Sequence, residues 1–168
     1  SLSGRRVRSR PAADPTQVEA LIEAMSKAKQ PVILSGSGVI WSQGWDELRG
    51  FVEDTGAPYY ATPQGRGVLP DDHKLTFPSV RTTAFREADL IIIVGTRQSF
   101  IIGHAAPPRF SASAKLARID VDPDEIATAP RKIDFPLIGD CKAVLQQLRA
   151  AAKGRIRPAQ FEAWRKTL

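Results

Sequence analysis

The sequence lacks several residue types on which catalytic and metal sites depend. It contains no asparagine, one cysteine (Cys141) and two histidines, His73 and His104, which stand far apart. A single cysteine excludes an internal disulfide and a zinc site built from several thiolates. Neither histidine belongs to a HExxH-type motif. We therefore expect no catalytic residue and no metal site in this chain, and a reducing, cytoplasmic setting.

Long apolar runs are missing as well. The longest strongly apolar run covers residues 90–94, which is far shorter than the ~20 residues that a membrane-spanning helix needs. The arginine-rich start of the chain is not followed by the apolar stretch of a secretory signal. We therefore expect no association with a membrane.

Charge is unevenly spread along the chain, whose net charge is +6. Residues 1–12 carry four arginines, and residues 149–168 carry six lysines and arginines against one acid, which leaves 14 basic and 17 acidic residues between them. Basic ends of this kind indicate solvated linkers rather than a nucleic-acid surface. We expect a basic linker at 1–13 and a linker towards a following domain at 153–168. A surface helix packed on the domain is the alternative for the second segment.

Between these ends, helical and strand-like apolar patterns alternate. Helical spacing covers about 15–29, 44–55, 80–88 and the stretch from 141, and short apolar runs typical of strands lie at 32–34, 59–61, 90–94, 116–121 and 133–138. Asp14 and Asp140 are predicted N-caps, and Gly56 is a predicted helix end. Strands that alternate with helices indicate βαβ crossovers. The predicted fold is α/β, a doubly wound, mostly parallel, Rossmann-like sheet in one domain, 14–152.

The loops after the predicted strands are the place to look for a site, because ligands of doubly wound sheets bind beyond the carboxyl ends of the strands. These loops hold small, basic and acidic residues. Glycines let the backbone approach a phosphate and expose amide donors, an arginine binds phosphate or stacks on adenine, and a carboxylate accepts from ribose hydroxyls. Turn, surface-pair and capping roles are the simpler alternatives, but five such loops together favour a nucleotide site.

The pattern is not that of an NAD-binding dehydrogenase half. The dinucleotide fingerprint needs a third glycine where Trp41 stands, and an acid at the end of the second strand, where residues 59–62 offer none. The first acid at a strand end comes later, at Asp120. A sirtuin-type deacylase of related fold is excluded too, because one cysteine cannot build its zinc site.

Five segments, taken in order, resemble the central domain of thiamine-diphosphate-dependent enzymes, the family that includes acetolactate synthase, oxalyl-CoA decarboxylase and 2-hydroxyacyl-CoA lyase. They are KQPVILSGSGV, TPQGRGVLPDDH, ADLIIIVGTRQSF, ARIDVDPDEI and FPLIGDCKAVLQQL. The resemblance is strongest to the acyl-CoA branch. It implies a six-stranded doubly wound sheet that binds FAD in some members and ADP or the nucleotide part of coenzyme A in others.

The resemblance also implies which residues contact the nucleotide. A glycine turn would line the diphosphate, two arginines and a threonine would contact phosphate or adenosine, and two acid-containing pairs would hold the ribose and flank the adenine. These residues are Gly36, Ser37, Gly38, Arg81, Thr82, Arg97, Asp120, Val121, Asp140 and Cys141. Some acyl-CoA members carry a lysine where this chain has Ser37, so the choice between ADP, coenzyme A and FAD stays open.

In this family the chemistry belongs to thiamine diphosphate and Mg²⁺, which two other domains hold through an activating glutamate and a Gly-Asp-Gly…Asn motif. This chain has neither Gly-Asp-Gly nor asparagine, so we expect it to be catalytically silent alone. The resemblance implies an ADP- or coenzyme A-binding central domain of a carbon–carbon lyase acting on 2-hydroxyacyl-CoA. Its partners would be the nucleotide or acyl-CoA and the two thiamine-diphosphate-binding domains of a dimeric or tetrameric parent. A purely structural domain with a vestigial pocket, and an FAD-binding domain of an acetolactate-synthase-like enzyme, are the alternatives.

Overall fold

A computed structural model describes residues 9–96 and 106–168 of the chain. Within these ranges five strands form one sheet in the order β2-β1-β3-β4-β5, and every neighbouring pair is parallel. Their bounds are β1 Pro31–Ser35, β2 Tyr59–Ala61, β3 Leu90–Val94, β4 Lys115–Asp120 and β5 Phe135–Ile138. Each apolar run of the sequence forms one of these strands. The described residues thus hold five strands where the family resemblance implied six.

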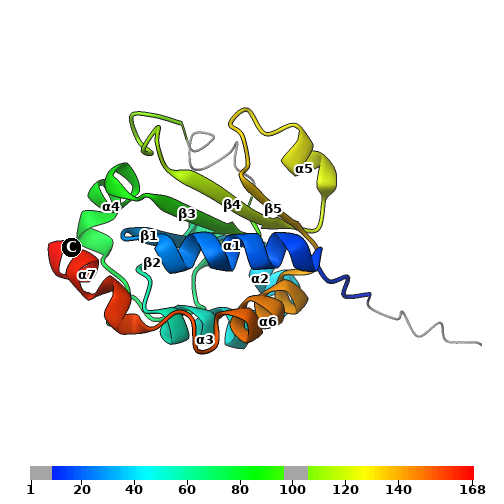
Figure 1. Ribbon diagram of the computed structural model, residues 1–168, viewed down its shortest axis with the longest axis horizontal. Helices are drawn as coiled ribbons and strands as arrows, with labels where there is room; N and C mark the ends of the chain where they lie inside the picture. The colour runs from blue at the N-terminus through cyan, green and yellow to red at the C-terminus, as the bar shows by residue number, and fades with distance from the viewer. Residues whose placement is uncertain (1–8, 97–105) are drawn as a thin grey trace, which may run out of the picture.

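Helices cover both faces of the sheet, as expected for a doubly wound fold (Figure 1). On one face α1 (Pro15–Lys27), α3 (Trp45–Thr55) and α6 (Cys141–Ala152) pack against side chains such as Ile33 and Ile92. On the other face α4 (Arg81–Glu87) packs with Phe110 against the alternate strand residues, which include Ile91 and Ile93. β1 and β3 are buried on both faces, and this explains why the sequence shows continuous apolar runs there.

The predicted helix signals act where the sequence places them. Asp14 caps α1 by accepting from the amide of Thr16 (2.9 Å), and Asp140 caps α6 by accepting from the amide of Ala143 (3.0 Å). Gly56 ends α3 with a left-handed φ of 72°, a conformation that glycine adopts without strain. Local capping chemistry therefore fixes the long helices.

Several short elements accompany the long ones. They are α2 (Gly38–Trp41), α5 (Pro123–Ala127), and the 3₁₀ turns η1 (Pro63–Gly65) and η2 (Pro78–Val80). A helix of four residues, such as α2, is too short to show a helical period in the sequence. No helix among the described residues has the length and apolar character required to cross a bilayer.

The C-terminal segment packs on the domain. It contains η4 (Pro158–Phe161) and α7 (Glu162–Thr167), and the side chains of Phe161 and Trp164 are buried. Trp164 Nε1 donates to the carbonyl of Pro31 at the start of β1 (3.0 Å), and Gln160 Nε2 donates to the carbonyl of Ser26 in α1 (2.8 Å). The segment therefore packs against the domain at the end of the sheet where β1 begins. That it leads on to a following domain stays a prediction.

Candidate functional site

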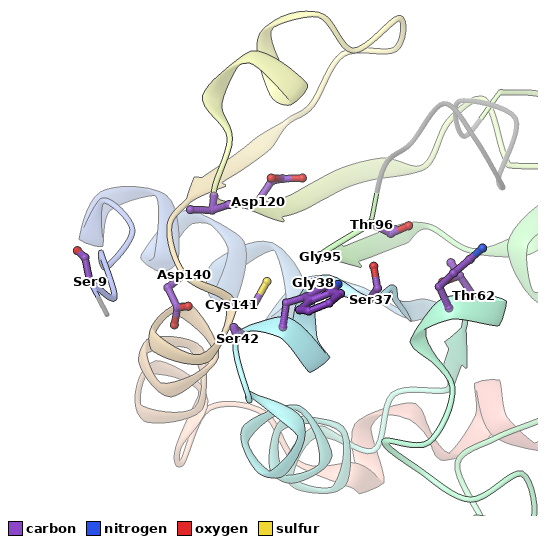
Figure 2. Close-up of a pocket in the computed structure, with 13 residues that line it drawn as sticks. Ser9, Ser37, Gly38, Ser42, Thr62, Gly95, Thr96, Asp120, Asp140 and Cys141 are labelled. Carbon is purple, nitrogen blue, oxygen red and sulfur yellow. The ribbon is translucent and has the colours of Figure 1, made fainter. Parts of the chain in front are cut away.

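A pocket of about 580 Å³ opens at the carboxyl ends of the strands. This volume lies within the ~300–1,000 Å³ typical of small-molecule sites. Figure 2 shows Ser9 and Asp140 at one end of the pocket, Thr62 at the other, and Asp120 on the wall formed by the end of β4. Its lining residues are Ser9, Ser37, Gly38, Trp41, Ser42, Thr62, Gln64, Gly95, Thr96, Asp120, Val121, Asp140 and Cys141. Loops after all five strands contribute.

The structure brings six of the ten predicted contact residues together here, namely Ser37, Gly38, Asp120, Val121, Asp140 and Cys141. Gly36 and Thr82 are not among the lining residues, and Arg81 lines a different hollow. Arg97 lies outside the described residues. Among the described lining residues none is basic and two, Asp120 and Asp140, are acidic.

The floor of the pocket is a backbone contact between the turns that follow β1 and β3. The amide of Gly36 donates to the carbonyl of Val94 (2.9 Å), and that of Gly38 donates to the carbonyl of Gly95 (2.8 Å). A Cβ atom at Gly38 would stand 2.7 Å from the Cα of Gly95, so only glycine permits this approach. We predicted that these glycines offer amides to a phosphate; both amides are already used within the fold.

Hydroxyl groups also line the pocket. Thr62 is 1% exposed, and its Oγ1 has no hydrogen-bond partner among the described residues. A buried polar atom in this state costs ~1–3 kcal/mol, and a ligand group in the pocket would remove that cost. Ser37 and Thr96 line the same pocket. Sequence reasoning placed Thr62 and Thr96 in strand-end loops but not among the contact residues. Their position within two residues of a strand end was the available signal.

Arg118 is buried and contacts Asp120 in the acidic wall of the pocket. Its guanidinium Nη2 lies 3.4 Å from Asp120 Oδ2 and 3.1 Å from Glu125 Oε2, and it donates to the carbonyl of Thr96 (2.9 Å). Asp120 Oδ1 accepts from the amide of Asp122 (2.9 Å). Burial raises the pKa of Asp120, and the amide of Asp122 and the charge of Arg118 act against that rise. Arg118 thereby joins the ends of β3 and β4 to the start of α5.

The opposite end of the pocket is formed by the start of α6 and the segment before α1. Arg10 Nη1 pairs with Asp140 Oδ2 (3.2 Å) and donates to the carbonyl of Ser42. Burial, followed by the charges of Asp120 and Asp140, raises the pKa of the Cys141 thiol to about 12. Cys141 is therefore a neutral wall residue rather than a nucleophile, because only a thiolate is reactive.

The fold is a doubly wound α/β domain with a pocket at the carboxyl ends of its strands. Residues 18–148 match the family model described as the thiamine pyrophosphate enzyme, central domain. The chain belongs to this family.

The similarity to named proteins agrees with this family assignment. The chain is 35% identical over 136 residues to 2-hydroxyacyl-CoA lyase 1 of Mus musculus, covering 81% of this chain and 23% of that protein. It is 30% identical over 139 residues to oxalyl-CoA decarboxylase of Escherichia coli (strain K12), covering 83% and 24%. The chain thus spans about a quarter of the length of these relatives.

A solved structure shares the fold. Benzoylformate decarboxylase from Polynucleobacter necessarius superposes with a TM-score of 0.73 at 24% identity. The match covers 92% of this chain and 29% of that one.

Proposed function

We propose that the chain is the central domain of a thiamine-diphosphate-dependent carbon–carbon lyase that acts on 2-hydroxyacyl-CoA, and that its strand-end pocket binds ADP or the ADP part of coenzyme A. The names of the two acyl-CoA relatives support the substrate class. The observation that carries the nucleotide assignment is the pocket itself, which joins a carboxylate, Asp120, to the buried unpartnered hydroxyl of Thr62. The proposal includes a homo-oligomeric parent whose two other domains hold the thiamine cofactor.

The residues of this chain do not fit thiamine diphosphate or its magnesium ion. The chain has no Gly-Asp-Gly and no asparagine, and the described residues contain no group of three or more His, Cys, Asp or Glu side chains that could hold a metal ion. When bound elsewhere in the parent, thiamine diphosphate supplies a carbanion. We therefore assign no chemical step to this chain.

The pocket offers a separate contact for each part of a nucleotide. Asp120 has acceptor capacity left beyond its two internal partners, because a carboxylate has about four lone-pair sites, and it would accept from the ribose hydroxyls. Trp41 is 75% exposed at the pocket, so its ring can cover the face of an adenine. The hydroxyls of Ser37, Thr62 and Thr96 would contact the phosphate groups.

We expect ADP and coenzyme A to raise the melting temperature of the purified chain. A ligand that binds only the folded state stabilises it by about 2.7 kcal/mol at a hundredfold excess over Kd. Asp120→Asn should abolish the shift, whereas Asp124→Asn, an equal change of charge at an exposed position outside the pocket, should not. FAD and NAD are the comparison ligands, and a larger shift with FAD would favour an FAD-binding domain. Absence of a shift with all four at millimolar concentration would leave the purely structural domain as the better description.

Tryptophan fluorescence locates the ligand within the chain. Trp41 is 75% exposed at the pocket, Trp45 is 42% exposed and outside the lining, and Trp164 is buried at the opposite end of the sheet. We expect ADP to quench the emission, because a stacked base covers the indole of Trp41. The quenching should vanish in Trp41→Phe and persist in Trp45→Phe, and the reverse pattern would contradict binding in this pocket.

The affinity for a nucleoside should fall at low pH through Asp120. Protonation turns one carboxylate oxygen into a donor and removes the charge, which weakens acceptance from the ribose hydroxyls. Burial raises the pKa of Asp120, so the loss of affinity should begin at a higher pH than for an ordinary aspartate of pKa ~3.9. Adenosine is the suitable probe because it has no phosphate to titrate. The measurement is its Kd from Trp41 quenching between about pH 8 and about pH 4. Asp120→Asn should bind weakly with no such dependence; an identical pH profile in this variant would rule the assignment out.

A further inference from the structure

A second hollow, of about 190 Å³, lies at the end of β2. The chain after β2 contributes to both cavities, since Thr62 and Gln64 line the main pocket while Arg66 and Gly67 line this one. The two cavities share no lining residue among those described. At this size the hollow is smaller than the ~300 Å³ lower end of sites for whole small molecules, so it suits a single small group.

One wall of the hollow is a guanidinium held in a fixed position. Arg81 Nη1 donates to the carbonyl of Ala61 (2.9 Å), and the Cζ atom lies 5.3 Å from the ring centre of Phe85 and 5.9 Å from that of Tyr60. The Tyr60 hydroxyl donates to the carbonyl of Phe77 (3.0 Å). A guanidinium carries five N–H donors, and the carbonyl of Ala61 uses the donor of only one nitrogen. Four of its donors are not used by this carbonyl, and Arg81 lines the hollow.

The hollow carries an excess of positive charge. Arg66, which is exposed, lines it together with Arg81. Burial, followed by the positive charges of Arg109 and Arg66, lowers the pKa of Arg81, and no carboxylate contributes to that shift. Asp71 is the one acidic residue among the described lining; it is exposed, and its backbone carbonyl accepts from the Thr76 hydroxyl (2.8 Å). A partly desolvated cation beside like charges favours a bound anion.

We propose that Arg66 and Arg81 form an oxyanion site that takes a phosphate group and is separate from the main pocket. The planar fork of arginine matches phosphate oxygens in pairs, and the volume fits one such group. The main pocket has no basic side chain among its described lining residues. The phosphate would therefore bind in the hollow, and the main pocket would bind the other parts of a ligand. The phosphate is either free or the remote phosphate of a nucleotide held in the main pocket, and this second source rests on the proposed function.

The primary test uses inorganic phosphate and the variant Arg66→Gln. Arg66 is exposed, so its replacement should leave the fold intact. Phosphate binding is measured by calorimetry and by melting temperature, with sodium chloride at matched ionic strength as the reference. We expect Arg66→Gln to weaken the phosphate Kd by about tenfold, as for loss of one charged hydrogen bond. Arg86→Gln, an equal change at an exposed position of α4 outside the hollow, should leave the Kd unchanged.

A second variant, Arg81→Lys, tests the geometry of the fork. The substitution keeps the charge but loses the paired N–H donors, so phosphate binding should weaken. Chloride should change the melting temperature of this variant as much as that of the unsubstituted chain. Phosphate that stabilises no more than chloride would overturn the proposal. Equal losses in Arg66→Gln and Arg86→Gln would overturn it as well, because general attraction to a basic protein would then explain the binding.

Further variants and ligands show whether the bound phosphate is free or belongs to a nucleotide, and they distinguish this site from the main pocket. Asp120→Asn should leave phosphate binding intact, so failure of nucleotide binding does not remove the anion site. If Arg66→Gln weakens coenzyme A, which carries an extra 3′-phosphate, but not ADP, the bound nucleotide supplies the phosphate. If it weakens inorganic phosphate alone, the site takes a free oxyanion. Loss of phosphate binding in Ser37→Ala, a change at a hydroxyl of the main pocket, with no effect of Arg66→Gln would place the phosphate in the main pocket and refute the second site.

Discussion

Replacing Arg118 by methionine is expected to lower the free energy of unfolding by about 3 kcal/mol, the lower end of the range for breaking a buried ion pair. The side chain is 1% exposed and contacts two carboxylates, Asp120 and Glu125. Its removal takes this guanidinium away from Asp120 and Glu125 and from the carbonyl of Thr96, to which it donates. The lower end applies because the Glu125 side chain is 29% exposed and water can reach it. Urea denaturation with a two-state fit gives the value.

A surface arginine is the matched control for this experiment. Arg155 also pairs with two carboxylates, Glu19 (2.7 Å) and Glu23 (3.3 Å), but all three side chains are at least one-third exposed. Exposed pairs contribute ~0–1 kcal/mol, so Arg155→Met should change stability little. If Arg118→Met costs no more than Arg155→Met, the buried arginine does not stabilise the strand ends as described.

Substituting Gly38 by alanine is expected to destabilise the fold by about 1–3 kcal/mol, as for other overpacked sites, and to weaken nucleotide binding more than tenfold. The added Cβ would stand 2.7 Å from both the Cα and the carbonyl oxygen of Gly95. These are backbone atoms, which cannot rotate away as a side chain would. The turns after β1 and β3 must therefore separate, and the floor of the pocket moves with them. Thermal denaturation and ADP titration measure the two effects.

A second glycine serves as the comparison. At Gly44 an added Cβ would approach Lys142 Cα at 3.2 Å, a contact that a shift of a few tenths of an ångström relieves. Gly44→Ala should therefore cost less stability and leave ADP affinity unchanged, since Gly44 does not line the pocket. Wild-type stability together with wild-type affinity in Gly38→Ala would show that the contact with Gly95 is not tight in solution.

The elements that sequence reasoning predicted well are those governed by local chemistry. Asp14 and Asp140 cap helices through side-chain contacts two or three residues away, and strands such as β3 are uninterrupted apolar runs. The C-terminal segment is different, because its position depends on Trp164 reaching the carbonyl of Pro31, 133 residues away. A short amphipathic pattern cannot reveal such a partner, and so the sequence favoured a linker there.

Sequence reasoning also located part of the pocket lining. The strand-end rule located Asp120 and Asp140, because parallel strands bring their carboxyl ends to one edge of the sheet. It did not locate Arg81, whose guanidinium turns to the carbonyl of Ala61 and lines a separate hollow. Nor could it show that the amide of Gly36 is used by β3, or that the hydroxyl of Thr62 lacks a partner. These are properties of register and burial, which appear only in three dimensions.

The glycine contact between the turns after β1 and β3 divides the pocket into a part that resists mutation and a part that tolerates it. The floor is main chain packed on main chain, so side chains added at Gly38 disturb the fold before they touch a ligand. The walls are side chains such as Ser37 and Trp41, which stand on exposed or half-exposed positions. Substitutions in the walls can therefore reshape the pocket while the scaffold stays the same.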